Sequence, residues 1–525
     1  MRKLALYLAY IFGLILIQGC HAFSDEAAFH GGTGVPLMEP GIGEPGDKYD
    51  AVGTQPFVVA SADPLSTFAA DVDTASYDIF RRDVESYGVL PVPASVRLEE
   101  YVNSFDYDLE APDWGDEHPF SITVEGARSP FAHTTLMRIG IQGVEVPKAE
   151  KKPANIVFMV DISGSMGSHD KLPLAKLVIS EALNSLSPTD TVAIVTYAGH
   201  ESVALVPTKA ANKSKILKVI ESLDASGSTA GQKGLALAYD QAEVGFIEGG
   251  VNHIIMCTDG DFNVGISDTN ALVDFIREKR ETGVTFTALG FGAGNLNDHM
   301  MESVSNAGNG FYSVISSQDQ AVDYAANSLW DTANLIARDV KIQVQFNPEF
   351  VSAYRLLGYE NRAIADHDFE NDKVDAGELG SGHRVTALYE LVLAGENIPQ
   401  PELAPQPLTD ETTVENLPII GSMVEVRVRY KEVMASEETP ALELKRGLRS
   451  EQILGRLDQG SPDLQWAAAI AAFAEILKQS PFASPSNLSV IEELVAMNTE
   501  GKSDRLEFQT LFLKASGLLQ GPNLL

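Results

Sequence analysis

The chain of 525 residues is longer than one ordinary domain and has room for about three or four. Its hydrophobic content of 44% allows sizeable cores and excludes wholesale disorder. With 38 Lys and Arg against 73 Asp and Glu, the formal charge is −35, and a surface of that sign makes nucleic acid a poor partner. Such an excess of carboxylates is typical of a solvated acidic surface, and it also attracts divalent cations.

The first residues, MRKLALYLAYIFGLILIQGC, have the layout of an export signal. Arg2 and Lys3 form a short positive segment, and the apolar run 4–17 is too short for a comfortable transmembrane helix. The run ends in IQGC, which resembles the lipobox of bacterial lipoproteins. That resemblance implies a signal peptide at 1–19, cleavage before Cys20 and lipid on the Cys20 thiol. An ordinary signal peptide and an uncleaved anchor are the alternatives.

His21, rather than Asp, follows the cysteine. By resemblance to the sorting rules of enteric-type bacteria, this implies an outer-membrane lipoprotein that faces the periplasm or the outside. Residues 20–63 are rich in Gly and Pro and lack an apolar period, which predicts a lipidated flexible tether. The other cysteine, Cys257, lies in the apolar run HIIMCTD. If Cys20 is lipidated, no disulfide forms within the monomer, and Cys257 is expected in a core.

Residues 64–153 predict a helical and β region. The segments DTASYDIFRRDVESYG and VPASVRLEEYVNSF have helical patterns. The acidic pair Asp71 and Asp73 could suggest a metal or phosphotransfer site, but helix capping by Asp73 or Thr74 accounts for it better. The runs FSITVEGA and LMRIGIQGV then alternate like half-exposed strands.

Further alternating runs appear only after residue 338, in a β-rich region at 336–446 that includes an acidic, Pro-rich loop. We expect an antiparallel sandwich shared between 119–144 and 336–446, with the intervening domain inserted into it. Residues 447–525 predict a helical region. Its segment DLQWAAAIAAFAEILKQS has about the length of a membrane span, but its charged residues favour a buried helix.

Residues 154–335 have a different pattern. The continuous apolar runs NIVFMVD, TVAIVTYA, HIIMCTD and TFTALGFG predict strands buried on both faces. Helical patterns separate them, in KLPLAKLVISEALNSL, STAGQKGLALAYDQA and ALVDFIREKRETG. Strands that alternate with helices predict an α/β domain with a doubly wound parallel sheet. Its ligand site should lie beyond the carboxyl ends of the strands.

Oxygen-bearing side chains gather at those ends. The stretch DISGSMGSHDK follows the first strand and carries Asp161, Ser163 and Ser165. Thr229 precedes a helix, and Asp259 follows the strand HIIMC. Hydroxyl and carboxylate oxygens are the ligands that Mg²⁺ prefers, and few direct carboxylates leave the ion seeking one more anionic oxygen. The five residues therefore predict a magnesium site with a position open to a partner's Asp or Glu, although Mn²⁺ or Ca²⁺ could also bind.

In its order and spacing, this set resembles the metal-ion-dependent adhesion site of von Willebrand factor type A domains. Further segments, including STFAADVDTASY, VRLEEYVNSFDY and SPDLQWAAAIAAFAEIL, resemble a family of bacterial lipoproteins built around such a domain. The family resemblance implies the fold and the metal site but not one settled activity.

The favoured hypothesis is a membrane-anchored module that uses the metal to bind a protein partner in adhesion or envelope assembly. A hydrolase is a weaker hypothesis, because the sequence lacks a G-x-S-x-G elbow around the serines and an H-E-x-x-H zinc pattern. We therefore expect no enzymatic activity. A third possibility is a non-catalytic partner of an ATPase or chaperone complex, but the resembling systems are cytoplasmic and this chain carries an export signal.

Overall fold

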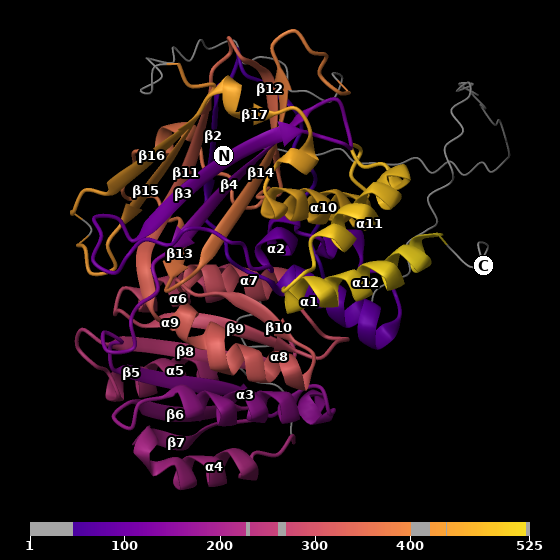
Figure 1. Ribbon diagram of the computed structural model, residues 1–525. Helices are drawn as coiled ribbons and strands as arrows, with labels where there is room; N and C mark the ends of the chain where they lie inside the picture. Colours follow the sequence, from indigo (N-terminus) through magenta and orange to yellow (C-terminus); the bar gives the residue numbers. More distant parts are fainter. Residues whose placement is uncertain (1–45, 227–231, 261–268, 401–420, 437, 521–525) are drawn as a thin grey trace, which may run out of the picture. The chain divides into compact units, whose positions relative to one another are not determined.

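The computed structural model describes residues 46–226, 232–260, 269–400, 421–436 and 438–520 (Figure 1). These residues form an α/β domain, a β-sandwich and a helical layer, which all belong to one compact unit of the chain. Cys20 and the predicted signal peptide lie outside the described residues, and so does Thr229.

The α/β domain is built on a six-stranded sheet in the order β10-β9-β8-β5-β6-β7. Its strands are β5 (Ala154–Asp161), β6 (Thr191–Tyr197), β7 (Glu201–Lys209), β8 (Val251–Thr258), β9 (Thr285–Phe291) and β10 (Tyr312–Ile315). Every neighbouring pair is parallel except β6 and β7. All residues of β5, β6 and β8 are buried, because helices cover both faces of the sheet.

One face of this sheet packs on α3 (Leu172–Ser185), α4 (Lys213–Ser222), α8 (Gln318–Asp323) and α9 (Leu329–Ala333). The opposite face packs on α5 (Gln232–Val244), α6 (Thr269–Arg280) and α7 (Asp298–Ala307). The predicted doubly wound α/β domain is therefore confirmed. Cys257 on β8 is fully buried in its core, as expected.

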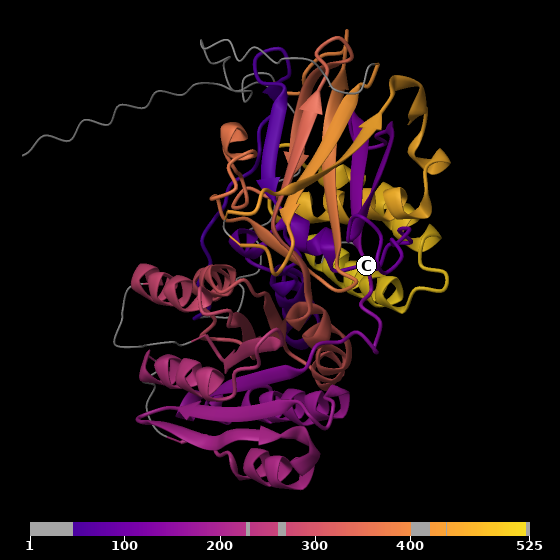
Figure 2. The same cartoon turned by 90° about the vertical axis from the view of Figure 1, so that its left-hand side faces the viewer.

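The sandwich combines strands from before and after the α/β domain (Figure 2). One sheet has the order β1-β12-β14-β4-β3-β17, and the other has the order β13-β11-β15-β16, with β2 also paired to β11. The strands are β1 (Val58–Val59), β2 (Leu65–Ala69), β3 (Phe120–Arg128), β4 (Thr135–Gly143), β11 (Leu335–Phe346), β12 (Val351–Leu357), β13 (Gly377–Gly380), β14 (Arg384–Leu393), β15 (Val424–Lys431), β16 (Leu442–Leu448) and β17 (Ile453–Leu454). The α/β domain is thus an insertion between β4 and β11.

The helical layer joins the two ends of the described chain. It comprises α1 (Ala75–Arg82), α2 (Leu98–Asn103), α10 (Pro462–Leu477), α11 (Leu488–Met497) and α12 (Ser503–Gln520). Aromatic rings from the N-terminal and C-terminal parts of this layer pack together, with Phe105 and Phe508 each in edge contact with Trp466. Helix α10 is buried along almost its whole length within this layer. None of the helices in the described ranges is long and apolar enough to cross a bilayer.

The predicted flexible tether at 20–63 is too long at its C-terminal end. Residues from 46 onward pack on the folded part: β1 pairs with β12, and the Asp47 side chain is fully buried. The prediction was wrong here because these residues carry no apolar period. The segment is fixed by individual buried contacts and by the two-residue strand β1, neither of which leaves an apolar pattern in the sequence.

Candidate metal site

Three of the predicted ligand residues lie together at the carboxyl edge of the α/β sheet. Asp161 ends β5, Ser163 begins the turn that follows, and Asp259 follows β8 directly. The strands β5 and β8 are parallel neighbours, with Val160 paired to Cys257, so both carboxylates reach the same edge. Asp161, Ser163 and Asp259 are 0%, 2% and 1% exposed.

Hydrogen bonds hold these groups in a tight turn. The Ser163 backbone N–H donates to Asp161 Oδ1 over 2.8 Å, and the Ser163 and Ser165 hydroxyl oxygens are 3.0 Å apart. The Thr258 hydroxyl donates to Asp161 Oδ2 over 3.3 Å. Ser165 is half-buried, so its hydroxyl lies nearer the surface than that of the buried Ser163.

The two carboxylates have different electrostatic surroundings. Burial raises the pKa of Asp161 to about 6, and the nearby charge of Asp259 adds to the rise. Burial acts in the same direction on Asp259. Its pKa is nevertheless lowered, because the Lys171 ammonium lies 3.0 Å from Oδ2 and hydrogen-bonds to it. Lys171 thus supplies a positive charge to a site that otherwise gathers oxygen atoms.

The loop between β9 and α7, residues 292–297, also supports Asp259. The Asn295 side-chain amide donates to Asp259 Oδ2 over 3.2 Å. Gly260, with a positive φ of 89°, lies against the same loop, and a Cβ there would be 2.6 Å from Leu296 Cα. The sequence did not reveal Asn295, which lies in a loop between elements and belongs to no motif. Lys171 stands inside the stretch DISGSMGSHDK, but its contact with Asp259 needs the fold.

The donor set fits a small, hard divalent cation. Two buried carboxylates and two hydroxyls offer oxygen atoms only, which suits Mg²⁺ and also Mn²⁺ or Ca²⁺. Burial raises the pKa of Asp161 to about 6, and a bound cation would stabilise the charged form of this buried carboxylate. Asp161, Ser163, Ser165 and Asp259 would hold the ion, and Thr229 remains a predicted ligand.

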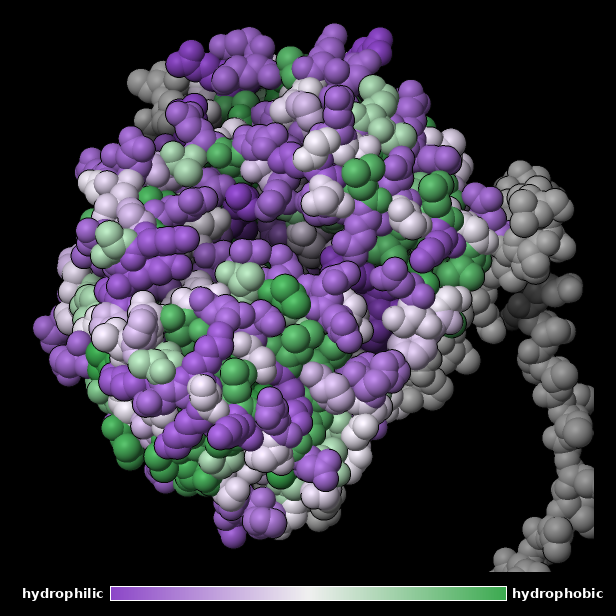
Figure 3. Space-filling model, turned by 60° about the horizontal axis from the view of Figure 1, so that its bottom comes forward, coloured by the Kyte–Doolittle hydropathy of each residue, from purple (hydrophilic) through white to green (hydrophobic). Residues whose placement is uncertain are grey.

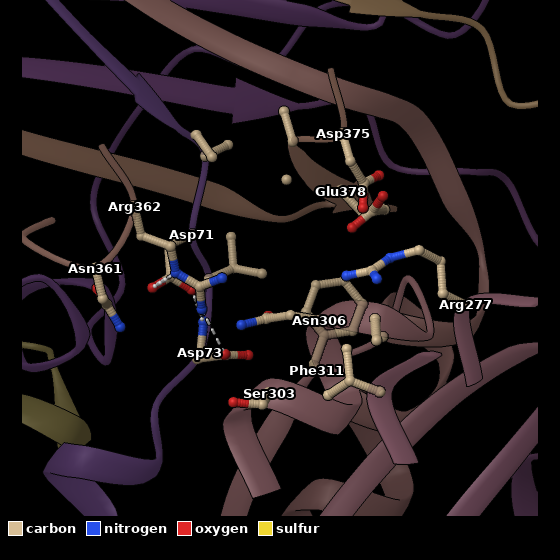
Figure 4. Close-up of a pocket in the computed structure, with 18 of the residues that line it drawn as sticks. Asp71, Asp73, Arg277, Ser303, Asn306, Phe311, Asn361, Arg362, Asp375 and Glu378 are labelled. Atoms are coloured by element: carbon tan, nitrogen blue, oxygen red, sulfur yellow. Dashed lines mark hydrogen bonds and ion pairs between the residues drawn. The ribbon is translucent and has the colours of Figure 1, made fainter. Parts of the chain in front are cut away.

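A second polar feature is a cleft of about 450 Å³ between the α/β domain and the sandwich (Figure 4). Arg362 crosses it and pairs with Asp71 and Asp73 at 2.9 Å each. The Asp73 carboxylate also accepts the Tyr312 backbone N–H of β10 over 2.8 Å. The prediction that these acidic residues cap a helix was wrong, since the N-terminal end of α1 at Thr74 has no side-chain cap. They join the two domains.

Comparison with known proteins identifies the segments of the chain. Residues 155–327 match the family model for the von Willebrand factor type A domain, residues 44–138 match a model described as von Willebrand factor, and residues 331–518 match "Uncharacterized protein YfbK, C-terminal". The uncharacterized protein YfbK of Escherichia coli is 35% identical over 489 residues, which cover 91% of this chain and 82% of the relative.

Two further matches are more distant. Human inter-alpha-trypsin inhibitor heavy chain H4 is 29% identical over 148 residues, covering 27% of this chain and 16% of the relative. A solved structure, von Willebrand factor type A from Catenulispora acidiphila, covers 76% of this chain and 97% of its own at 14% identity, with a TM-score of 0.42.

Proposed function

Because this chain belongs to the family of von Willebrand factor type A domain proteins that includes Escherichia coli YfbK, we propose that it is a divalent-cation-dependent protein-binding module. Domains of this family are commonly protein-interaction or adhesion modules. The observation that carries the proposal is the convergence of Asp161, Ser163 and Asp259 at one sheet edge, with donors of a single chemical class. The metal would supply a Lewis-acidic position for a carboxylate of the partner.

The chain's own residues would hold the cation and set its remaining charge. Asp161 and Asp259 would hold the cation with two negative charges. The Lys171 ammonium already neutralises part of that charge, so the cation would retain affinity for one further anionic oxygen. An Asp or Glu side chain of a protein partner meets that requirement.

The surface around the α/β domain is consistent with polar recognition. Polar residues cover much of the face shown in Figure 3, and hydrophobic residues are scattered among them. Single exposed apolar side chains such as Val206 and Val244 need no partner. A partner that binds the metal would be recognised by a specific polar contact, the bond between its carboxylate and the cation.

The serines would act as ligands and not as nucleophiles. A catalytic serine needs a base within hydrogen-bond reach. Within the described ranges, no histidine hydrogen-bonds to Ser163 or Ser165. Their hydroxyls contact each other and hydrogen-bond to Asp161 and Asp259, which are themselves predicted ligands. We therefore propose a non-catalytic role, with Cys20 anchoring the module to the outer membrane through its lipid.

The test is capture of partners from envelope extracts by the purified protein. Mg²⁺ should support capture, while a chelator or Asp161→Ala should abolish it. Asp240→Ala is the matched control, because this exposed carboxylate lies on α5 away from the site and should bind partners normally. Capture that persists with the chelator and with Asp161→Ala would exclude the proposed function.

A further inference from the structure

The N-terminal segment Gly46–Tyr49 packs directly on the loop that supports Asp259. The Asp47 carboxylate Oδ1 accepts the backbone N–H groups of Gly294 and Leu296 over 2.8 and 2.9 Å. The Lys48 backbone N–H donates to the Leu296 carbonyl over 2.7 Å, and its carbonyl accepts the Asp298 N–H over 3.1 Å. The backbones of the segment and of the loop are therefore hydrogen-bonded to each other.

Arg82 contacts both Asp47 and the loop. Its guanidinium lies 2.8 Å from Asp47 and donates to the Gly292 carbonyl over 3.1 Å. The side chains of Arg82 and Asp47 are 1% and 0% exposed. A buried carboxylate that accepts two backbone N–H groups and an arginine is held by charge-assisted bonds, which are stronger than neutral ones. The loop 292–297 is thus fixed at both its first and its last residues.

Close backbone contacts continue from the segment to the metal site. A Cβ on Gly46 would be 2.0 Å from the Gly294 carbonyl oxygen, and a Cβ on Gly260 would be 2.7 Å from the Asn297 nitrogen. The loop therefore packs tightly between the N-terminal segment and the turn after Asp259. Asn295, in the middle of this loop, donates to the Asp259 carboxylate.

We propose that Asp47 is a positioning residue of the metal site, which holds loop 292–297 so that Asn295 fixes the Asp259 carboxylate for the cation. The inference rests on the proposed metal binding. Through this contact the N-terminal segment, which continues from the predicted lipid tether, sets the affinity of the site for the metal. Release of Gly46–Tyr49 from the loop would weaken metal binding at a distance from the ligands themselves.

The experiment compares the full chain with Asp47→Ala, Asn295→Ala and the double variant. Mn²⁺ titration measures affinity, and hydrogen exchange measures the order of residues 292–297. Loss of outer support for metal ligands typically weakens affinity by about tenfold or more, so we expect a loss of that size in each single variant. Because both act through one loop, the double variant should lose no more than the larger single loss.

Asp50→Ala is the matched control. Asp50 directly follows the segment, but its side chain is 74% exposed, and within the described part of the chain its ion pair is with His299, at 3.9 Å. This variant should keep wild-type affinity and exchange. Asn295→Ala leaves Asp47 and Arg82 intact, so it remains informative if Asp47→Ala does not fold.

Wild-type Mn²⁺ affinity in a folded Asp47→Ala chain, or in Asn295→Ala, would overturn the positioning role while leaving metal binding in place. Failure of the wild-type chain to bind Mn²⁺ would overturn the proposed function and the positioning role together. A double variant whose loss of binding free energy equals the sum of the two single losses would also contradict the inference, since independent effects do not pass through one loop.

Discussion

His253 illustrates how a single buried residue ties the stability of the α/β domain to pH. It lies on β8 with 0% exposure, and its Nδ1 is 2.6 Å from the Thr285 hydroxyl. Burial lowers the pKa of His253 to about 3, from an ordinary value of 6.5. Between pH 6.5 and 3 the ring is therefore neutral in the folded chain, whereas the unfolded chain would protonate it.

The sign of the effect follows from this difference. Between pH 6.5 and 3 the unfolded chain binds more protons at His253 than the folded chain, so stability falls as pH falls. At pH 5 the expected loss from this residue is about 2 kcal/mol. His253→Gln should flatten the pH dependence of urea unfolding between pH 7 and 5, while His169→Gln, at an exposed position, should not. A parallel slope in both variants would show that other groups cause it.

Residues of the metal site differ in how far sequence alone could reveal them. Asp161, Ser163 and Asp259 could be placed because each directly follows an apolar run, and parallel strands bring their carboxyl ends to one edge. Lys171 and Asn295 could not, because their contacts with Asp259 depend on how a turn and a distant loop approach it. Thr229 remains a prediction from the same pattern.

At the scale of elements, Arg362 joins the sandwich to the α/β domain. Its partners Asp71 and Asp73 are 3% and 2% exposed as side chains. Burial, and next the charge of Asp71, raise the pKa of Asp73 to about 8 even with Arg362 beside it. The pair of carboxylates therefore depends on this one guanidinium for compensation.

Arg362→Met should destabilise the chain by about 3 kcal/mol, because the buried acidic pair Asp71 and Asp73 loses its hydrogen-bonded cation. Adding Asp71→Asn and Asp73→Asn should restore part of that loss, since the uncompensated charge is then removed. Chemical denaturation gives both values. Arg277→Met is the control in the same cleft: its side chain is 53% exposed and pairs with the exposed Asp274, so the change should stay within about 0.5 kcal/mol. An Arg362→Met chain as stable as wild type would show that the pair contributes little.

The elements that sequence could predict are those with regular burial. Strands β5, β6, β8 and β9 lie inside the sheet and produce unbroken apolar runs. The edge strand β7 has mixed exposure and gave no such signal. Asp71 and Asp73 were misread as helix caps because capping is local, whereas their partner Arg362 is remote in the chain. Long-range pairing of this kind has no local pattern.

At the scale of the whole molecule, membrane attachment is predicted to depend on one atom, the sulfur of Cys20. Cys20→Ser removes the predicted lipidation site and leaves the predicted export signal unchanged. The expected outcome is a shift of the protein from the membrane fraction to the soluble periplasmic fraction after cell lysis. Wild-type protein in the cytoplasmic fraction would contradict export and would favour the ATPase-partner hypothesis.

The insertion of the α/β domain between β4 and β11 has a consequence for the order of folding. β4 pairs with β14 and β2 pairs with β11, so the sandwich cannot close until strands that follow the insertion have been made. The α/β sheet needs only its own strands. Its two ends meet in space, since a Cβ on Gly143 would be 2.7 Å from Ile336 Cδ1.

Closing a long unfolded loop costs more entropy than closing a short one. Once the inserted domain has folded and brought its ends together, the sandwich strands on either side are no longer separated by a long flexible chain. The inserted domain should therefore fold first and hold the flanking strands of the sandwich close together. A destabilised α/β domain would then slow the assembly of the sandwich strands on both sides of it.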